Sequence, residues 1–493
     1  MKVVIIGNGI LALSIAFKLL KNSDSDITIV GPSNRLGAAT PCAGAMLNSF
    51  AELEHGSLDS EASQEYFGMS YLATQQWPDF ERELIDYAGD KLPSECASCQ
   101  VLTGGCFSKG TYIINNAMSD QLEDLNYQAI VKGLEDFNEQ YSEVDPKDIP
   151  NYFPEPRHRA LKALYIHNEG WLNPKIVLKK LDNILYTNPR VTYVDQRVTA
   201  ISESNGNVTS ITTESGLLIK GDEFVLANSF GVSELLSGTS FDEVVQPIFS
   251  SVGVSLEIKS PDANHTHVIR TPNRGGGCGI YAVPYFKGPG ESKNHVLIGA
   301  SSVVTIKPRF NGRIVSVAHL LHSAINEINL NFYNAELIHT NVGNRPTSLD
   351  QYPLLGRAAD SNLLIATGTK RDGFHLAPLI SDYIYNLICH PKKEDPYKLF
   401  SPTRKLIRNI SREKAIDALV VGKINEAYQH GFHASSIFQI QQLESDWRRT
   451  ITEVHDQVGA QSWGIPNQML GVYREVLANK DLYANIYNYI LRG

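Results

Sequence analysis

The sequence predicts a mixed α/β fold that begins with a strand–turn–helix unit and ends in a helical region. Three observations predict it. Residues 3–6 form a short apolar run, as in a buried parallel strand, and a glycine turn (7–9) and a helical pattern follow. Residues 191–231 alternate between polar and apolar side chains, as in a β-meander. Residues 396–493 have long helical patterns with few helix-breaking residues.

The composition is that of an ordinary soluble protein. The chain has 493 residues, which suggests about two to four domains, and is 42% hydrophobic and 20% charged. Its net charge of −9 gives no general attraction to nucleic acid or to an anionic membrane. The six cysteines are too few for a disulfide scaffold, and glycines, Ser14 and Lys18 interrupt the apolar N-terminal run. We therefore expect a cytoplasmic protein without a membrane span.

The first unit predicts a site for a phosphate-containing ligand. A strand over 3–6 leads through Gly7 and Gly9 into a helix from Ile10 to Leu20. Glycines at this turn let the backbone approach a pyrophosphate, which binds at the positive end of the helix. Ala12 takes the third position of the glycine motif, where close packing of helix on strand is needed. The alternative is a glycine turn in an α/β protein that binds no nucleotide.

The second strand, Ile27–Val30, ends at Gly31 and lacks the acidic residue that usually binds a ribose. Ser33 and Arg35 follow, and together they favour the 2′-phosphate of NADP. This part of the chain therefore leaves FAD and NADP open.

Five later stretches identify the kind of protein when they are taken together and in order. They are LGAATPCAGAML (36–47), GWLNPKIVLKKL (170–181), the meander (191–231), GIYAVPYFKGPGESKNHVLIGASS (279–302) and NVGNRPTSLDQYPLLGRAADSNLLIATGTKRDGFHLAP (341–378). The set resembles the D-amino-acid oxidase superfamily of FAD-dependent oxidoreductases, with glycine oxidase among its nearest members. The resemblance covers roughly residues 1–392. Its last motif is the most specific and belongs to a flavin site, which favours FAD over NADP.

The resemblance implies a Rossmann-like FAD-binding domain made of residues 1–85, 150–240 and 340–395. A substrate-binding α+β domain with an antiparallel sheet would comprise 86–149 and 241–339. Residues 396–493 would be an additional C-terminal helical domain. Such a domain would cap the active site, form a homo-oligomer or dock a partner.

The resemblance also implies cofactor contacts. They would be made by Gly7, Gly9, Ala12, Ser33, Asn34, Arg35, Thr40, Ala43, Gly44, Met46, Val198, Gly373, Phe374, His375 and Leu376. A packed histidine at the start of a helix is the alternative for His375. We expect non-covalent FAD, because residues 340–378 contain no cysteine.

The resemblance assigns the substrate carboxylate to Arg345, Arg371 and Tyr281. An arginine fork and a phenol are suited to binding a carboxylate. The alternatives are salt bridges for the two arginines and a half-buried strand aromatic for Tyr281.

The expected function is oxidation of the amine of a small amino acid, such as glycine or an N-substituted glycine. Hydride transfer to FAD would give an imine, then an oxo acid, and oxygen would be reduced to hydrogen peroxide. Departures from the family pattern at Gly31, at Asn228-Ser229 and in residues 246–253 indicate a divergent specialist. The alternatives are a dehydrogenase with another electron acceptor and a flavin-binding scaffold that acts through its C-terminal domain.

Three further stretches have weaker interpretations. The CASC sequence (96–99) with nearby Cys106 suggests a metal or redox site, but no second CxxC is present, so we expect a plain loop and no metal. His430 and His433 are interpreted as solvated or capping residues. The glycine-rich stretch 274–281 predicts a flexible loop at the mouth of the substrate domain.

Overall fold

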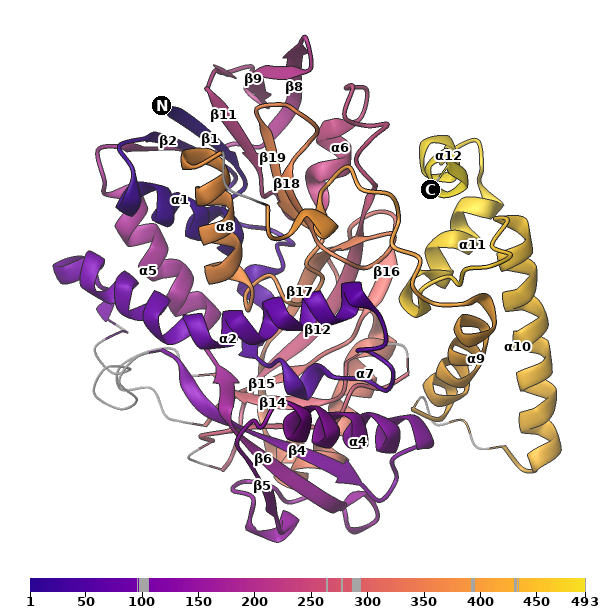
Figure 1. Ribbon diagram of the computed structural model, residues 1–493. Helices are drawn as coiled ribbons and strands as arrows, with labels where there is room; N and C mark the ends of the chain where they lie inside the picture. Colours follow the sequence, from indigo (N-terminus) through magenta and orange to yellow (C-terminus); the bar gives the residue numbers. More distant parts are fainter. Residues whose placement is uncertain are drawn as a thin grey trace.

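The protein is described from a computed structural model (Figure 1). The structure describes residues 1–94, 96, 106–262, 265–275, 278–285, 294–391, 395–429, 432 and 434–492. Most of the CASC sequence, residues 276–277 of the glycine-rich stretch, and both His430 and His433 lie outside these residues. The interpretations of those stretches therefore stay predictions.

Within the described residues, a six-stranded sheet forms the base of the nucleotide-binding part. Its strands are, in spatial order, β18 (Leu354–Arg357), β19 (Leu363–Thr367), β11 (Glu223–Leu226), β1 (Lys2–Ile6), β2 (Asp26–Val30) and β7 (Val191–Val194). All neighbouring strands are parallel except β18, which is antiparallel to β19. We call it the parallel sheet.

Both faces of the parallel sheet are covered, which is why β1 is apolar throughout. Val3 and Ile5 face a core shared with the helices α1, α2, α5 and α8. Val4 and Ile6 face a second core on the opposite side. The four helices are α1 (Ile10–Asn22), α2 (Glu61–Ala88), α5 (Pro174–Tyr186) and α8 (Ala377–Cys389), and they lie on one side of the sheet in Figure 1.

The middle of the predicted meander forms a small antiparallel sheet on the second face, whereas its first and last strands, β7 and β11, belong to the parallel sheet. The small sheet consists of β8 (Val198–Ser204), β9 (Asn207–Thr213) and β10 (Leu218–Ile219). Helix α6 (Val232–Leu236) packs into the same core.

The second layer is a large, mostly antiparallel sheet, with ten strands among the described residues. Its path is β16 (Val303–Thr305), β12 (Ile248–Lys259), β15 (His295–Gly299), β14 (Tyr281–Pro284), β13 (Val268–Arg270), β4 (Ser108–Asn116), β6 (Ala160–Trp171) and β3 (Met46–Leu47). Two strands lie off this path: β17 (Glu336–Ser348) pairs with β12, and β5 (Tyr141–Val144) pairs with β6. Helices α4 (Gln121–Asp136) and α7 (Ile314–Ser323) contribute to cores beside this sheet.

The C-terminal region is helical, as the sequence predicts. Its α-helices are α9 (Arg412–Gln429), α10 (Ile437–Gln457), α11 (Leu470–Ala478) and α12 (Ala484–Arg492), drawn at the yellow end of the colour scale in Figure 1. They share one apolar core with Phe249, Val304 and Leu349 of the remaining chain. The extension therefore packs directly onto the oxidoreductase part. Searching the described helices finds none that combines the length and apolar character of a membrane span.

The predicted fold class is confirmed: a parallel nucleotide-binding sheet, an antiparallel substrate sheet and C-terminal helices are all present. The predicted division into domains stays a prediction. Strand β6 falls in the range assigned to the FAD-binding domain, and β17 begins at residue 336 and continues into the last segment of that range. Both strands pair within the large sheet.

Candidate functional site

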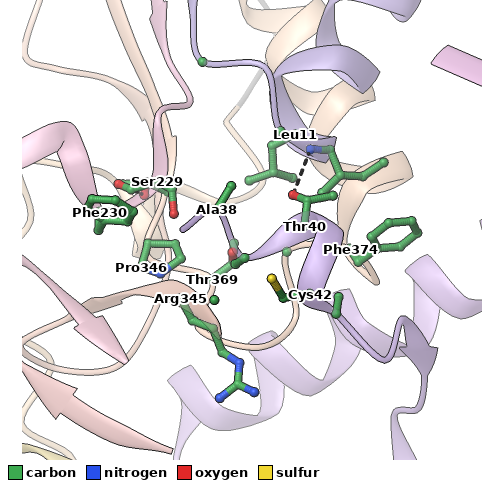
Figure 2. A pocket seen from close by; sticks show the side chains of 18 of the residues that line it. Leu11, Ala38, Thr40, Cys42, Ser229, Phe230, Arg345, Pro346, Thr369 and Phe374 are labelled. Carbon is green, nitrogen blue, oxygen red and sulfur yellow. Dashed lines mark hydrogen bonds between the residues drawn. The ribbon is translucent and has the colours of Figure 1, made fainter. Parts of the chain in front are cut away.

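A cavity of about 300 Å³ lies where the carboxyl ends of the parallel strands meet the large sheet. One side is lined by the turn after β1 and the first turn of α1, and the other by residues of β14 and β17. In open α/β sheets, ligands bind at this end of the strands. Figure 2 shows part of the lining, with Thr40 and Leu11 near the helix terminus and Arg345 on the other side. No residue among the described parts of 396–493 lines this cavity.

The N-terminus of α1 has the features of an anion-binding site. Gly7 has a φ of +119°, and a Cβ at this position would overlap the carbonyl of Ala227. The N-cap residue is Gly9, which has no side chain that could cap the helix. The first turn also contains no acidic residue. The backbone N–H of Ile10 donates to Thr40 Oγ1 at 3.2 Å. This donor set, backbone N–H groups at a positive helix end, fits the pyrophosphate of FAD.

Arg35 lines the end of the cavity where the sequence predicts the adenosine, but its guanidinium is not a free cation. Its Nη atoms donate to both carboxylate oxygens of Asp182, at 2.6 and 2.9 Å. Its Nε donates to the carbonyl of Asn8 at 2.9 Å. Because the guanidinium is already paired in this bidentate manner, the argument for a 2′-phosphate loses its main support.

The two other residues predicted at the ribose lie just outside the cavity lining. Ser33 donates from its backbone N–H and its hydroxyl to Asp195, both at 2.7 Å. Asn34 Oδ1 accepts from the backbone N–H of Leu36 at 3.1 Å. Val198 lines the cavity at this end, next to Arg197 and Thr199.

The turn between β19 and α8, where the sequence predicts contacts with FAD, also lines the cavity. Gly373 and Phe374 line the cavity, and the Phe374 ring stacks on Trp77 with ring centroids 5.6 Å apart. His375 is buried behind this surface, where its Nε2 is hydrogen-bonded to Thr74 Oγ1 at 2.6 Å. Burial lowers the pKa of His375 to about 4, so its imidazole is neutral at pH 7. This agrees with the packed histidine that the sequence leaves as the alternative.

Arg345 brings an uncompensated positive charge into the cavity from β17. Its Nη1 donates to the carbonyl of Ser301 at 3.0 Å. No carboxylate within the described part of the chain forms an ion pair with it. Gly253 on the neighbouring strand makes room for it, because a Cβ there would overlap the guanidinium. The side chain thus has free donors for an anion.

Tyr281 lies in the same part of the cavity and is 4% exposed. Burial raises the pKa of its phenol to about 12, although Arg345 acts in the opposite direction. Gly44 and Gly299 leave space for its ring, since a Cβ at either would crowd the phenol. At neutral pH Tyr281 is therefore an uncharged hydrogen-bond donor.

Arg371 also lines the cavity, but its charge is already paired. Its Nη2 lies 2.8 Å from Glu52 Oε2 and 3.6 Å from Glu54 Oε1. Its Nη1 donates to Cys278 Sγ at 3.0 Å. The salt bridge that the sequence leaves as the alternative is present for this arginine.

Glu52 is a cavity residue that the sequence reasoning missed. Arg270 Nη1 donates to its Oε1 at 2.5 Å, and Asn273 Nδ2 donates to its Oε2 at 3.1 Å. Burial acts to raise the pKa of Glu52, but Arg270 and Arg371 outweigh it and hold this pKa at about 2. Glu52 follows the motif 36–47 at a distance of five residues, and only the fold brings it to Arg270.

Lys370 and Asp372 are two more missed residues of the lining. Lys370 Nζ donates to Gln351 Oε1 at 2.8 Å. Burial, reinforced by the charge of Arg371, lowers the pKa of Lys370 to about 8. The Tyr66 hydroxyl donates to Asp372 Oδ2 at 2.5 Å. Both residues flank Arg371 in the motif, so the motif itself could have predicted that they lie at the cavity.

The cavity brings together most of the residues that the sequence singles out. Those in its lining are Gly7, Gly9, Arg35, Thr40, Ala43, Gly44, Met46, Val198, Tyr281, Arg345, Arg371, Gly373 and Phe374. The others, Ala12, Ser33, Asn34, His375 and Leu376, lie outside the lining. Among the described residues, no group of histidine, cysteine and acidic side chains could hold a metal ion. The contacts of individual residues with FAD or substrate stay predictions.

Comparison with known proteins gives relatives and structures of similar fold. The bifunctional protein ThiO/ThiG of Nostoc sp. (strain PCC 7120 / SAG 25.82 / UTEX 2576) is 23% identical over 398 residues, which cover 80% of this chain and 53% of that protein. The chain spans about half or less of the length of the curated relatives it matches.

Two solved structures show the shared fold. Iminodiacetate oxidase from Chelativorans sp. BNC1 superposes with a TM-score of 0.64 at 17% identity, over 81% of this chain and 98% of that one. Glycine oxidase from Geobacillus kaustophilus superposes with a TM-score of 0.63 at 19% identity, over 83% of this chain and 98% of that one.

The family itself follows from a match over most of the chain. Residues 2–387 match the family described as FAD dependent oxidoreductase (DAO). This range contains both sheets and all residues of the cavity. The protein therefore belongs to the DAO family of FAD-dependent oxidoreductases.

Proposed function

We propose that the protein oxidises the amine of a small α-amino acid, either glycine, an N-substituted glycine or a related compound. One observation carries this proposal: the unpaired guanidinium of Arg345 lies in the cavity of an FAD-dependent oxidoreductase, beside the neutral phenol of Tyr281. A cationic fork and a phenol together suit a substrate carboxylate.

The charges around the cavity support a substrate with one carboxylate at this end. Glu52 and Glu54 face Arg270 and Arg371, so these four charges largely cancel. Of the three arginines Arg270, Arg345 and Arg371, Arg345 then remains as the partner for an anion. Holding the carboxylate there fixes the distance from Arg345 to the α-carbon, and this positioning is what the protein contributes to rate.

FAD, when bound, would accept the hydride from the α-carbon, and the oxidised substrate would leave as an imine that hydrolyses to an oxo acid. In this proposal FAD is held without a covalent bond. Oxygen is the electron acceptor and is reduced to hydrogen peroxide. The residues of this chain bind and orient the substrate and exclude water from the buried end of the cavity.

The first experiment tests the cofactor. The purified protein is expected to be yellow, with a flavin spectrum, and acid precipitation should release FAD into the supernatant. Flavin that stays with the precipitate would contradict non-covalent binding, and a colourless protein that takes up no FAD would contradict the cofactor itself.

The second experiment tests the reaction and Arg345. A peroxide-coupled screen covers glycine, sarcosine, longer N-alkylglycines and both enantiomers of small amino acids. Arg345→Leu is expected to raise KM for the best substrate by about 100-fold or more, because a charged hydrogen-bonded pair is lost. Flavin content should not change.

Arg82→Leu on α2 is the matched control, because Arg82 is 67% exposed and pairs with Asp79 on the same helix. Unchanged kinetics in Arg345→Leu would overturn the carboxylate assignment. Turnover with an artificial electron acceptor but no peroxide would show a dehydrogenase.

A further inference from the structure

Asn48 is a buried side chain of the cavity whose amide has no partner within the protein. It follows β3 directly, lines the cavity and is 3% exposed. Neither its Nδ2 nor its Oδ1 makes a hydrogen bond with any other residue. Among the asparagines and glutamines of the described chain, this is the one buried amide with both side-chain atoms unpartnered.

The backbone around Asn48 is well fixed, so the free amide does not result from a loose loop. The N–H groups of Ser49 and Phe50 both donate to Glu169 Oε1, at 2.5 Å each. Leu47 pairs with Gly170 of β6 on the other side. The backbone of Asn48 is therefore held firmly at the wall of the cavity.

Asn344, a buried asparagine between the lining residues Gly343 and Arg345, is by contrast satisfied. Asn344 on β17 donates from Nδ2 to the carbonyls of Gly37 and Arg309, and its Oδ1 accepts from the N–H of Arg309. Buried polar groups without a partner are rare in folded proteins and lower stability. Because Asn48 lines the cavity, a ligand that binds there can supply its missing partners.

Asn48 and Arg345 reach the cavity from opposite ends of the large sheet. Asn48 follows β3, the last strand of the path, and Arg345 lies on β17, which pairs with β12 near the first strand. Both residues nevertheless line the same cavity. A ligand whose carboxylate is held by Arg345 can therefore present its other end to Asn48.

The chemistry of the amide selects the group at that end. Nδ2 is a donor and Oδ1 is an acceptor. A carboxylate would satisfy Nδ2 and place negative charge against Oδ1, and an ammonium would satisfy Oδ1 alone. A carboxamide or a hydroxyl satisfies both atoms and carries no charge. An uncharged group suits this site because the nearby charges of Glu52, Arg270 and Arg371 are already paired with one another.

We propose that Asn48 binds an uncharged donor–acceptor group, a carboxamide or a hydroxyl, at the end of the substrate opposite its carboxylate. The substrate is then an amino acid or N-substituted glycine that bears such a group. This assignment deepens the proposed function and rests on it. It makes Asn48 a specificity-determining residue.

The test compares shape-matched substrates. N-(carbamoylmethyl)glycine and N-isobutylglycine differ only in whether their branched end is an amide or a hydrocarbon. The wild-type holoenzyme is expected to favour the amide by at least tenfold in kcat/KM. Asn48→Leu, which has a similar volume, should abolish this preference through KM for the amide, and flavin content should stay constant.

A binding measurement makes the test independent of turnover. Succinamate and 4-methylpentanoate, which have the same shape, are titrated into the holoenzyme while the flavin absorbance is followed. Tighter binding of succinamate in the wild type but not in Asn48→Leu supports the assignment even if no amine is oxidised. Failure of all amines to react would count against the proposed function alone.

Two variants serve as controls for folding. Asn341→Leu removes another buried amide with an unpartnered Nδ2, on β17 but outside the cavity lining, and should keep the wild-type preference. Asn48→Asp keeps the volume and should weaken succinamate binding if Asn48→Leu does not fold. An amide preference that survives in both Asn48 variants would overturn the proposal, and so would loss of FAD from them, since the amide would then belong to the cofactor.

Discussion

At the scale of single residues, the neighbours of a side chain decide its role more than its motif does. Arg345 and Arg371 both come from family motifs, and both line the cavity. Arg371 is paired with Glu52 and Glu54, so binding a substrate carboxylate would require competition with two carboxylates already in place. Arg345 has no such partner among the described residues and is therefore the stronger candidate for binding the substrate carboxylate.

Lys370 gives a prediction about pH at this scale. Its pKa near 8 lies below the usual value for lysine, so its charge is present at pH 6–7 and is lost as pH rises through 8. The cavity then becomes less positive. We expect the affinity for a simple carboxylate, measured by flavin absorbance, to fall roughly three- to tenfold between pH 7 and pH 9.

Lys370→Met separates this effect from other titrations. It should bind the carboxylate about as weakly at pH 7 as the wild type does at pH 9, and its affinity should hardly change over that range. A fall of the same size in this variant would show that another group titrates.

At the scale of elements, one loop connects the cavity to the C-terminal extension. The loop between β13 and β14 leads from Arg270, which pairs with Glu52, to Cys278, which contacts Arg371. Its Gly275 packs against helix α9, so close that a Cβ would lie 2.9 Å from Asn425 Cβ and 3.0 Å from Gly422 Cα. Helix α9 thus supports the loop from outside the cavity.

Gly275→Ala tests this contact. The added methyl group should force loop and helix apart and lower the free energy of unfolding by about 1–3 kcal/mol, as overpacking does. The affinity for a carboxylate ligand should fall as well, because the loop positions Cys278 and Arg270. Thermal unfolding and flavin titration measure the two effects.

Gly471→Ala in α11 is the control, since a Cβ there would meet nothing within 4 Å. It should raise helix stability by up to about 1 kcal/mol and leave ligand binding unchanged. If Gly275→Ala behaves like this control, the extension does not support the loop.

The sequence predicts elements well where the signal is local. The first strand, its glycine turn and helix α1 follow from adjacent residues, and so does Pro174 in the first turn of α5. Glu52 and Asn48 could not be found in this way. Glu52 is significant because of Arg270, 218 residues away, and Asn48 because its amide lacks a partner, which only coordinates show.

At the scale of the whole molecule, the extension and the oxidoreductase part are joined by buried contacts. Arg404 places Nη2 2.8 Å from Asp350 Oδ1, and both side chains are buried. The N–H of Ile407 also donates to Asp350. Of the roles that the sequence leaves open for residues 396–493, capping the cavity directly is not what the described residues do.

Arg404→Leu should therefore destabilise the whole protein. It leaves the buried carboxylate of Asp350 without its cation, which costs about 3–5 kcal/mol of unfolding free energy. Chemical denaturation followed by flavin fluorescence measures this loss. Arg448→Leu, which breaks an exposed pair with Asp417, should cost less than about 1 kcal/mol. An equal loss of unfolding free energy in the two variants would contradict a core shared by the extension and the oxidoreductase part.

The core that the extension shares with the oxidoreductase part also has a consequence for folding during translation. Phe249 and Val304 of the large sheet are covered by helices that are translated after residue 411. At about 5–20 residues per second, the ribosome needs roughly 4 to 16 seconds to translate residues 412–492, which contain these helices. Through that interval no C-terminal helix covers this apolar surface, and transiently exposed apolar surface makes a nascent chain prone to aggregation.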